Sequence, residues 1–263
     1  MRKYYYIFRS EVMSSLKYVF NIFINFIVYF LLIFVFLCLW QYMYSDSTQL
    51  INGYTMHQMM WYLIVTETLY SVVSGRKYCK KLSEDVKGGS IAYNLNKPYS
   101  YIEYCLFSHL GEISIKGIVY LVCSFLIGLV FIGEVPHITI LSIIPILLTF
   151  IMSLFISTTI LMGIGLLSFF IEDSSPFYWM YSKIILVFGT IFPIEFFPKM
   201  IQPFIKFSPI YAISYGPANL FVDFKWEKFL LVIFTQIIYF IISYLIVTLI
   251  YRKGVRRLNV NGS

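Results

Sequence analysis

Six long apolar segments alternate with shorter polar segments along this chain of 263 residues. A helix of roughly 20 apolar residues crosses the ~30 Å hydrocarbon core of a bilayer, and most of these segments reach that length. The pattern therefore predicts an all-α membrane protein whose six transmembrane helices form one domain over residues 1–263. The predicted spans are residues 18–44, 54–74, 101–132, 138–171, 177–192 and 226–251.

The segment before the first predicted span, residues 1–17, is basic and aromatic. Its polar residues Lys3, Ser10, Ser14 and Lys17 share one face of a helix, and aromatic and aliphatic residues follow another face. This distribution is typical of a helix that lies in the membrane interface. The alternative is a short basic anchor with no further role.

Two predicted spans have unusual features. The third begins with a mixed stretch, residues 101–116, which we expect to approach the membrane as a helix. The fourth is uncharged over residues 138–171. A straight helix of that length would measure about 50 Å, which exceeds the hydrocarbon core. We therefore expect this helix to tilt, protrude or break, with a kink at Pro145.

Composition agrees with a membrane protein. Hydrophobic residues make up 59% of the chain, charged residues 13%, and the mean hydropathy is +0.78. These values are far from those of soluble domains. The net charge of +7 suits loops beside an anionic lipid leaflet, so we predict the bilayer as a partner and no nucleic-acid partner. Abundant Ile, Phe, Tyr, Asn and Lys indicate a bacterial source with an AT-rich genome.

The distribution of lysine and arginine predicts the orientation. Residues 1–17, 76–100 and 252–263 together hold 14 of them, whereas residues 45–53 and 133–137 hold none. Basic segments stay on the cytoplasmic side of a membrane. The chain is therefore predicted to be a multi-pass plasma-membrane protein with both termini in the cytoplasm.

The longest polar interruption is residues 76–100, which we expect to be the largest internal surface offered to water. Gly88 and Gly89 permit a sharp turn, and Pro98 ends the structure that follows. An apolar helical face with flanking charges suits docking onto another protein, although such a helix can also pack on the membrane surface. Three apolar residues share that face: Ile91, Ala92 and Leu95.

Residues 193–225 are rich in proline and phenylalanine, and too apolar for an ordinary exposed loop. Irregular backbone at membrane depth persists only where protein or water covers it. The segment therefore either re-enters the outer leaflet as short helices or lies in the outer interface. We favour re-entrant helices before the last span.

Charged residues within apolar segments are candidates for function. Glu67 lies near the middle of the second predicted span, and Lys183 lies in the fifth. Glu67 either lines a translocation path or pairs with Lys183 or Lys116 to hold the helix bundle together. Glu195, in the proline-rich segment, is a candidate for the same two roles.

Motifs for catalysis and cofactor binding are missing from the sequence. It contains no phosphate-binding loop, no HExxH, no GxSxG and no cluster of His and Cys at metal-ligand spacing. Its four cysteines form no CxxC pair and indicate no disulfide framework. We therefore expect no catalytic residue, no metal and no cofactor on this chain.

Two stretches resemble a known family. One runs from Glu84 through Gly89 to Pro98, with acidic and basic residues, glycine, a short apolar helix and proline in that order. The other is the proline-punctuated segment from Phe192 to Tyr211. Both are similar to ABC-2 type transporter permeases, especially the six-span branch associated with drug, viologen and natural-product efflux.

The resemblance implies a permease subunit of an ABC exporter, without an ATPase site of its own. Two copies of a separate ATPase would carry ATP and Mg on the cytoplasmic side. A second permease, identical or homologous, would complete a path for a drug-like, peptide or lipid-like substrate. The resemblance also implies the residues that couple to the ATPase: Glu84, Asp85, Lys87, Gly89, Ile91, Leu95 and Pro98.

Three other functions fit the apolar pattern less well. A secondary transporter needs related halves and coupling charges, and no clear repeat is visible in the sequence. An integral membrane enzyme needs a polar cluster at the interface. A non-transporting anchor or sensor subunit would have much the same sequence, so it stays open as an alternative.

Overall fold

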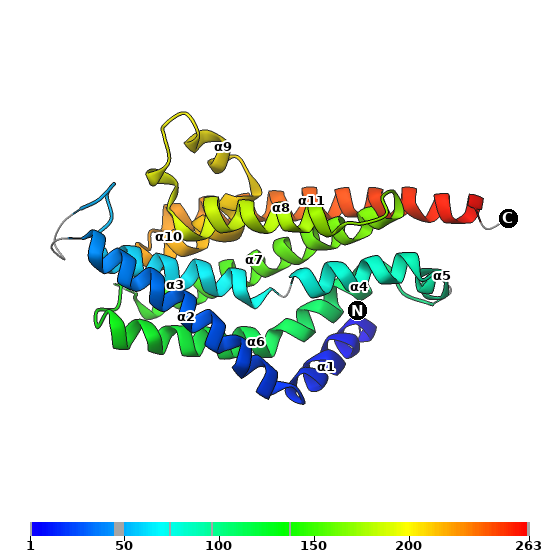
Figure 1. The fold of residues 1–263 in the computed structure, drawn as a ribbon, viewed down its shortest axis with the longest axis horizontal. Coiled ribbons are helices and arrows are strands. Elements are labelled where there is room, and N and C mark those ends of the chain that lie inside the picture. Colours follow the sequence, from blue (N-terminus) through cyan, green and yellow to red (C-terminus); the bar gives the residue numbers. More distant parts are fainter. Residues whose placement is uncertain (1, 45–49, 74, 96, 137, 262–263) are drawn as a thin grey trace.

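The computed structural model describes residues 2–44, 50–73, 75–95, 97–136 and 138–261, apart from the side chains of residues 92, 95 and 258–261. Over these ranges the chain is a bundle of helices without a β-strand (Figure 1). The predicted all-α class is confirmed.

The first half of the described chain begins with a short helix and a long one that meet at an elbow (Figure 1). Its helices are α1 (Arg2–Leu16), α2 (Val19–Met43), α3 (Met56–Val72), α4 (Gly75–Lys87), α5 (Ser90–Leu95) and α6 (Tyr101–Phe131).

The second half combines two long helices with several short ones. Two of the short ones, η2 and η4, are π-helical, and η1 and η3 are 3₁₀ turns. The elements are α7 (Ile140–Leu166), η1 (Leu167–Phe169), α8 (Ser175–Ile185), η2 (Leu186–Ile191), η3 (Ile194–Phe196), α9 (Gln202–Lys206), η4 (Tyr211–Tyr215), α10 (Gly216–Val222) and α11 (Trp226–Asn261).

Four helices of the described chain are long and apolar enough to cross a membrane: α2, α6, α7 with η1, and α11. They coincide with the first, third, fourth and sixth predicted spans. The other two predicted spans correspond to α3, which has 17 residues, and to α8 with its continuation η2. These helices are shorter than the roughly 20 residues that a straight span needs.

The short helix α3 forms the centre of the bundle. Met59, Met60 and Leu63 are fully buried, as are most of its other residues. α3 packs against α2, α6 and α10. The capping box of Thr55 and Gln58 fixes its N-terminus. By contrast, α2 and α11 leave most of their apolar residues exposed, as expected of helices that face lipid.

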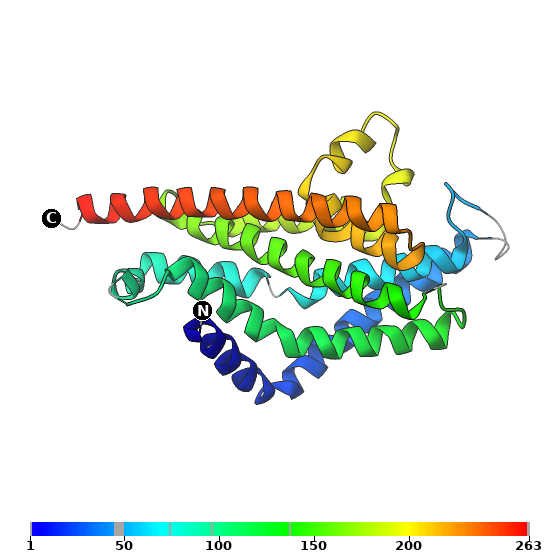
Figure 2. The same ribbon diagram turned by 180° about the vertical axis from the view of Figure 1, so that it is seen from behind.

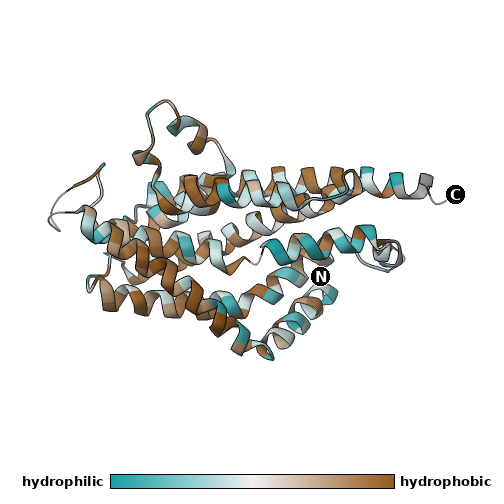
Figure 3. Ribbon diagram, in the orientation of Figure 1, coloured by the Kyte–Doolittle hydropathy of each residue, from teal (hydrophilic) through white to brown (hydrophobic). Residues whose placement is uncertain are grey.

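The polar residues gather toward one end of the bundle. Figure 3 shows hydrophilic positions on α4 and at the C-terminal end of α11, while the rest of the bundle is mainly hydrophobic. The reverse view shows the N-terminus, α5 and the C-terminus in the same half of the molecule (Figure 2). This arrangement agrees with the predicted clustering of basic segments on one side.

In the fourth predicted span, α7 continues through Pro145, so the helix does not break there, and the kink at that residue stays a prediction. The helix tightens instead into η1 at Leu167–Phe169, close to the turn before α8. The predicted helix over residues 1–17 is present as α1, which packs closely against α6. A Cβ at Gly111 would lie 2.6 Å from the backbone oxygen of Phe8, so only glycine permits this approach.

The proline-rich segment divides into a buried part and a protruding part. η4 and α10 pack against α3 and α7 and bury Ala212 and Ala218 completely. α9 stands away from the bundle (Figure 1) and exposes the apolar side chains of Phe204 and Phe207. Short helices therefore make up much of this segment. Protein covers the η4–α10 part most fully, although Ile194 of η3 and Ile205 of α9 are also buried.

Candidate functional site

α4 presents a buried face to α7 and a charged face to the outside. Tyr78, Leu82 and Val86 lie on the buried face at helical spacing. Cys79 shares this face, and its Sγ donates to the backbone oxygen of Leu161 at 3.2 Å. Burial raises the pKa of the Cys79 thiol to about 12, so the thiol stays protonated and unreactive at neutral pH.

Residues 76–100 are therefore not the water-exposed loop that their charge suggested. The lysines of α4 stand on one side of this amphipathic helix, and the apolar residues between them form a core with α7 and α11. The number of basic residues suggested a solvated loop, although they and the apolar residues follow the spacing of an amphipathic helix.

Gly165 brings α4 and α7 into close contact. A Cβ on Gly165 would lie 2.9 Å from the Cβ of Leu82 and 3.2 Å from the backbone oxygen of Cys79. The hydroxyl of Ser168 adds a hydrogen bond of 2.7 Å to Ser83 one turn further on. Because these contacts involve backbone and Cβ atoms, α4 and α7 have little freedom to slide past each other.

A glycine turn and Asp85 position the short helix α5. Gly89 adopts φ +72°, a conformation that favours glycine, and thereby reverses the chain between α4 and α5. Asp85 accepts a hydrogen bond of 2.9 Å from the Ser90 hydroxyl and one of 3.1 Å from the Tyr101 phenol. Asp85 thus links α4, α5 and the start of α6.

Ile91 is completely buried, which corrects the prediction that it faces a partner. It packs in the cluster formed by α4, the start of α6 and α11. Ile91 therefore points into the chain itself, where apolar burial is already available without a second protein. The side chain of Leu95, the other predicted docking residue, lies outside the described residues.

The outward face of this region is aromatic and charged. The Tyr93 side chain is 72% exposed, and the Lys97 ammonium lies 4.8 Å from its ring centroid. Glu84 is exposed and pairs with Lys80 at 3.7 Å. Lys87 and Pro98 are also exposed, and the backbone oxygen of Pro98 accepts a hydrogen bond from the ammonium of Lys3 in α1.

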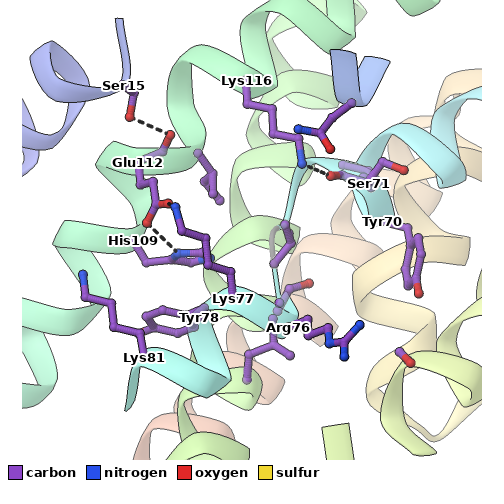
Figure 4. A pocket seen from close by; sticks show the side chains of 18 of the residues that line it. Ser15, Tyr70, Ser71, Arg76, Lys77, Tyr78, Lys81, His109, Glu112 and Lys116 are labelled. Atoms are coloured by element: carbon purple, nitrogen blue, oxygen red, sulfur yellow. Dashed lines mark hydrogen bonds and ion pairs between the residues drawn. The ribbon is translucent and has the colours of Figure 1, made fainter. Parts of the chain in front are cut away.

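A cavity of about 880 Å³ lies beside this region, where α3 ends and α4 begins. It is lined from the elbow of α1 and α2 on one side and from α6, α7 and α8 on the others (Figure 4). Its size is within the range of sites for small ligands.

Charged side chains lie along one wall of this cavity. The Lys77 ammonium pairs with the Glu112 carboxylate at 2.8 Å, and His109 Nδ1 lies 3.9 Å from the other oxygen of Glu112 (Figure 4). The ring of the buried His109 stacks on that of Tyr78, with 3.9 Å between centroids. Ser15 donates to the backbone oxygen of Glu112 at 3.0 Å, which ties α1 to this group.

Comparison with known protein families is decisive for the class of the molecule. The model of the ABC-2 family transporter proteins matches residues 23–262. The chain belongs to the ABC-2 transporter family. It is thus a transmembrane component, or permease, of an ABC transporter, and this family lacks an ATPase domain of its own and generally works with an ABC ATPase. The search of curated proteins gave no match.

Glu67 lies inside the bundle of this ABC-2 permease. It is 2% exposed, and Oε1 accepts a hydrogen bond of 2.8 Å from the Ser71 hydroxyl. Its other oxygen has no hydrogen-bond partner in the described part of the chain. Among the ion pairs of the described residues, none joins Glu67 to Lys183 or Lys116. The predicted charge pairing is therefore not formed in this conformation.

The two lysines considered as partners of Glu67 contact other groups in the permease. The Lys116 ammonium donates to the backbone oxygen of Ser71 at 2.5 Å, and it also lies 5.2 Å from the ring centroid of Tyr120. The Lys183 ammonium lies 5.9 Å from the ring centroid of Trp179, one turn earlier in α8. The role of Glu67 and Lys183 in a translocation path stays a prediction.

Glu195 joins several elements of the permease at the opposite end of the bundle. Its carboxylate accepts hydrogen bonds from the phenols of Tyr54 at 3.2 Å and Tyr215 at 2.5 Å. Asn219 donates to the Tyr54 oxygen at 2.9 Å and accepts from Lys228 at 3.0 Å. This network links η3, η4, α10 and α11. Whether Glu195 serves bundle pairing or a translocation path stays a prediction.

Sequence reasoning missed the group around Glu112 for a clear reason. His109, Glu112 and Lys116 follow i, i+3, i+7 spacing, which does indicate a shared face of α6. Their partners, Lys77 on α4 and Ser15 on α1, are distant in the sequence. Local spacing carries no signal for such long-range contacts.

Proposed function

We propose that this ABC-2 permease is the membrane subunit of an ATP-driven exporter. The observation that carries the proposal is the α4–α5 unit, whose inner face packs on α7 while its outer face presents charged and aromatic side chains. A separate ABC ATPase, in two copies, docks on the outer face. ATP and Mg bind to the ATPase, and this chain binds no cofactor.

The docking surface consists of the exposed side chains of α4, α5 and the turn that follows. Tyr93 supplies an aromatic anchor, and aromatic residues with charged neighbours are common at the centres of protein interfaces. Glu84, Lys87 and Lys97 surround it with charge of both signs. Three residues support this surface without contacting the partner, because they hold α5 in place: Asp85, Gly89 and Ile91.

The orientation follows from the location of the basic residues. The α4–α5 end, both termini and most lysines and arginines face the cytoplasm. This requires six crossings, so α3 and α8–η2 cross together with the four long helices. The modest length of α3 is tolerated because neighbouring helices, instead of lipid, cover it. α1 lies in the inner interface, and α9 dips into the outer leaflet.

Through the close contact at Gly165, a movement of the α4–α5 unit is transmitted directly to the span α7. When ATP draws the ATPase subunits together, they push α5 and α4, and α7 moves with them since the contact permits little sliding. A second permease, identical or homologous, forms the other wall of the path. The substrate is a drug-like, peptide or lipid-like molecule that leaves toward the outside.

Co-purification with an ABC ATPase tests this proposal. The chain alone is expected to hydrolyse no ATP, because it has no phosphate-binding loop. Co-expressed with the ABC ATPase of its own transporter, it is expected to purify as a complex with ATPase activity that depends on Mg. ATP hydrolysis by the rigorously purified chain would contradict the proposal. So would a failure of the chain to bind the ABC ATPase of its own transporter.

A further inference from the structure

The helix α1 engages two of its charged residues within the chain. Glu11 is the single acidic residue of this helix, and its carboxylate accepts a hydrogen bond of 2.9 Å from Ser108 in α6. The Lys3 ammonium donates to the backbone oxygen of Pro98, in the stretch between α5 and α6. Two positions correspond to about 200° around a helix, so Arg9 points away from α6. The outer face of α1, which is turned away from α6, therefore has no carboxylate of this helix.

The outer face of α1 carries three cations. Arg2, Arg9 and Lys17 are exposed, and at about 3.6 residues per turn their spacing places them within about 80° of one another. Arg9 and Lys17 line one shallow groove, together with Tyr6 and Met13, and no described residue that lines this groove is acidic. None of the three cations forms an ion pair within the described part of the chain. Their positive charge is therefore available to a partner.

The outer face of α1 lies where the chain enters the membrane. A short turn separates α1 from the long apolar helix α2, and both views show this elbow at the edge of the bundle (Figures 1 and 2). Phe20 and Phe23, in the first turns of α2, are 80% and 59% exposed, as expected of side chains that face lipid. Tyr5 and Tyr18 are also exposed, and tyrosine favours the boundary between hydrocarbon and headgroups. The cations of α1 are thus close to the lipid headgroups.

We propose that the outer face of α1 binds the headgroups of anionic phospholipids, through Arg2, Arg9 and Lys17. Tyr6 and Met13, which lie between these cations, add apolar contact. Guanidinium and ammonium groups favour phosphate, and a basic helix at a bilayer surface is attracted to net negative lipid. A zwitterionic lipid also has a phosphate, but its own cation would meet like charge on α1. The assignment of these lipids to the cytoplasmic leaflet rests on the proposed orientation, whereas the binding surface does not.

A fluorophore in the groove of α1 tests this binding on the permease without its ATPase. Bimane is attached to Ser10→Cys in a chain whose accessible cysteines are removed by Cys38→Ala/Cys123→Ala. The nanodiscs consist of phosphatidylcholine with a small fraction of doxyl-labelled phosphatidylglycerol or doxyl-labelled phosphatidylcholine as quencher. The anionic quencher is expected to be at least about fivefold more effective at low salt, because each basic residue near an anionic surface strengthens the attraction about fivefold. Salt of about 0.5 M is expected to reduce this preference.

Two variants of α1 test whether its charge selects the lipid. Arg2→Gln/Arg9→Gln/Lys17→Gln is expected to bring quenching by the two lipids to within about twofold of each other, because the attraction to net negative lipid is lost. All three side chains are exposed, so this variant is expected to unfold at the same temperature as the wild type. Arg2→Lys/Arg9→Lys keeps the charge and is expected to keep the preference for phosphatidylglycerol.

The matched control removes the same number of arginines and lysines from exposed positions near the end of α11, by Lys253→Gln/Arg256→Gln/Arg257→Gln. This control is expected to keep the preference of the wild type. Equal quenching of the wild type by both lipids would overturn the inference and leave the outer face of α1 to a protein partner. A preference that persists in the triple variant of α1, or that both triple variants lose, would overturn it as well. Because no ATPase is present, failure here leaves the proposed function to its own test.

Discussion

Gly165→Leu is expected to lower the free energy of unfolding of the permease by about 3 kcal/mol, the upper part of the usual range for overpacking. The new side chain meets the Cβ of Leu82 and the backbone oxygen of Cys79, which cannot move without displacing α4. Thermal unfolding in detergent measures this loss. Any variant that still inserts is expected to bind the ATPase but fail to stimulate ATP hydrolysis, because α7 no longer follows α4.

Gly117→Ala is the control for this prediction. It also replaces a glycine within a long helix, α6, but its Cβ would lie 3.5 Å from Val72, which is ordinary van der Waals contact. Alanine favours helix over glycine by about 1 kcal/mol, so this variant is expected to be neutral or slightly stabilised. A Gly165→Leu variant with wild-type stability and ATPase stimulation would show that α4 and α7 are not rigidly joined.

The second large effect is the different outcome expected for aspartate substitutions at Ile91 and Tyr93, both on α5. Ile91→Asp places a carboxylate in a fully buried apolar cluster and is expected to cost several kcal/mol of stability. Tyr93→Asp changes an exposed side chain and is expected to change the free energy of unfolding by less than about 0.5 kcal/mol. It is nevertheless expected to abolish co-purification of the ATPase.

Phe207→Asp provides the control, because it replaces another highly exposed aromatic residue, 85% exposed against 72% for Tyr93, near the opposite end of the bundle. We expect it to retain the ATPase. Thermal unfolding and pull-down are measured on all three variants. Should Tyr93→Asp keep the ATPase while stably folded, the outer face of α5 would not be the docking surface.

The helices were largely predictable from the sequence because membrane spans have a strong local signal. Uninterrupted apolar runs gave α2, α7 and α11 within a few residues at most ends. The short helix α5 was also foreseen, since Gly89 and Pro98 bracket it. Both kinds of prediction depend on residues that are near each other in the chain.

The direction in which a helical face points was not predictable. Ile91 and its neighbours form an amphipathic pattern that suits a partner protein and the chain's own core equally well. Only the tertiary arrangement of α4, α6 and α11 shows that the core takes Ile91. Likewise, the lysines of α4 suggested a loop, although the apolar residues between them follow helical spacing.

The charged residues inside the bundle show the same limit. Glu67 and Lys183 were considered as partners because both lie within apolar segments, yet Glu67 accepts a hydrogen bond from Ser71 on its own helix. Glu195 binds two phenols, of which Tyr54 is distant in the sequence. A sequence shows that burying a charged group has a free-energy cost, but it does not show which hydrogen-bond partner offsets that cost.

Photocrosslinking from α5 tests the central claim most directly. p-Benzoylphenylalanine in place of Tyr93 is expected to crosslink the ABC ATPase in the native membrane. The same group in place of Leu50, which is exposed and precedes α3, is expected to give no such product. The loop before α3 lies at the end of the bundle opposite α5 (Figure 1). Crosslinking from position 50 but not from position 93 would contradict the orientation and the docking surface together.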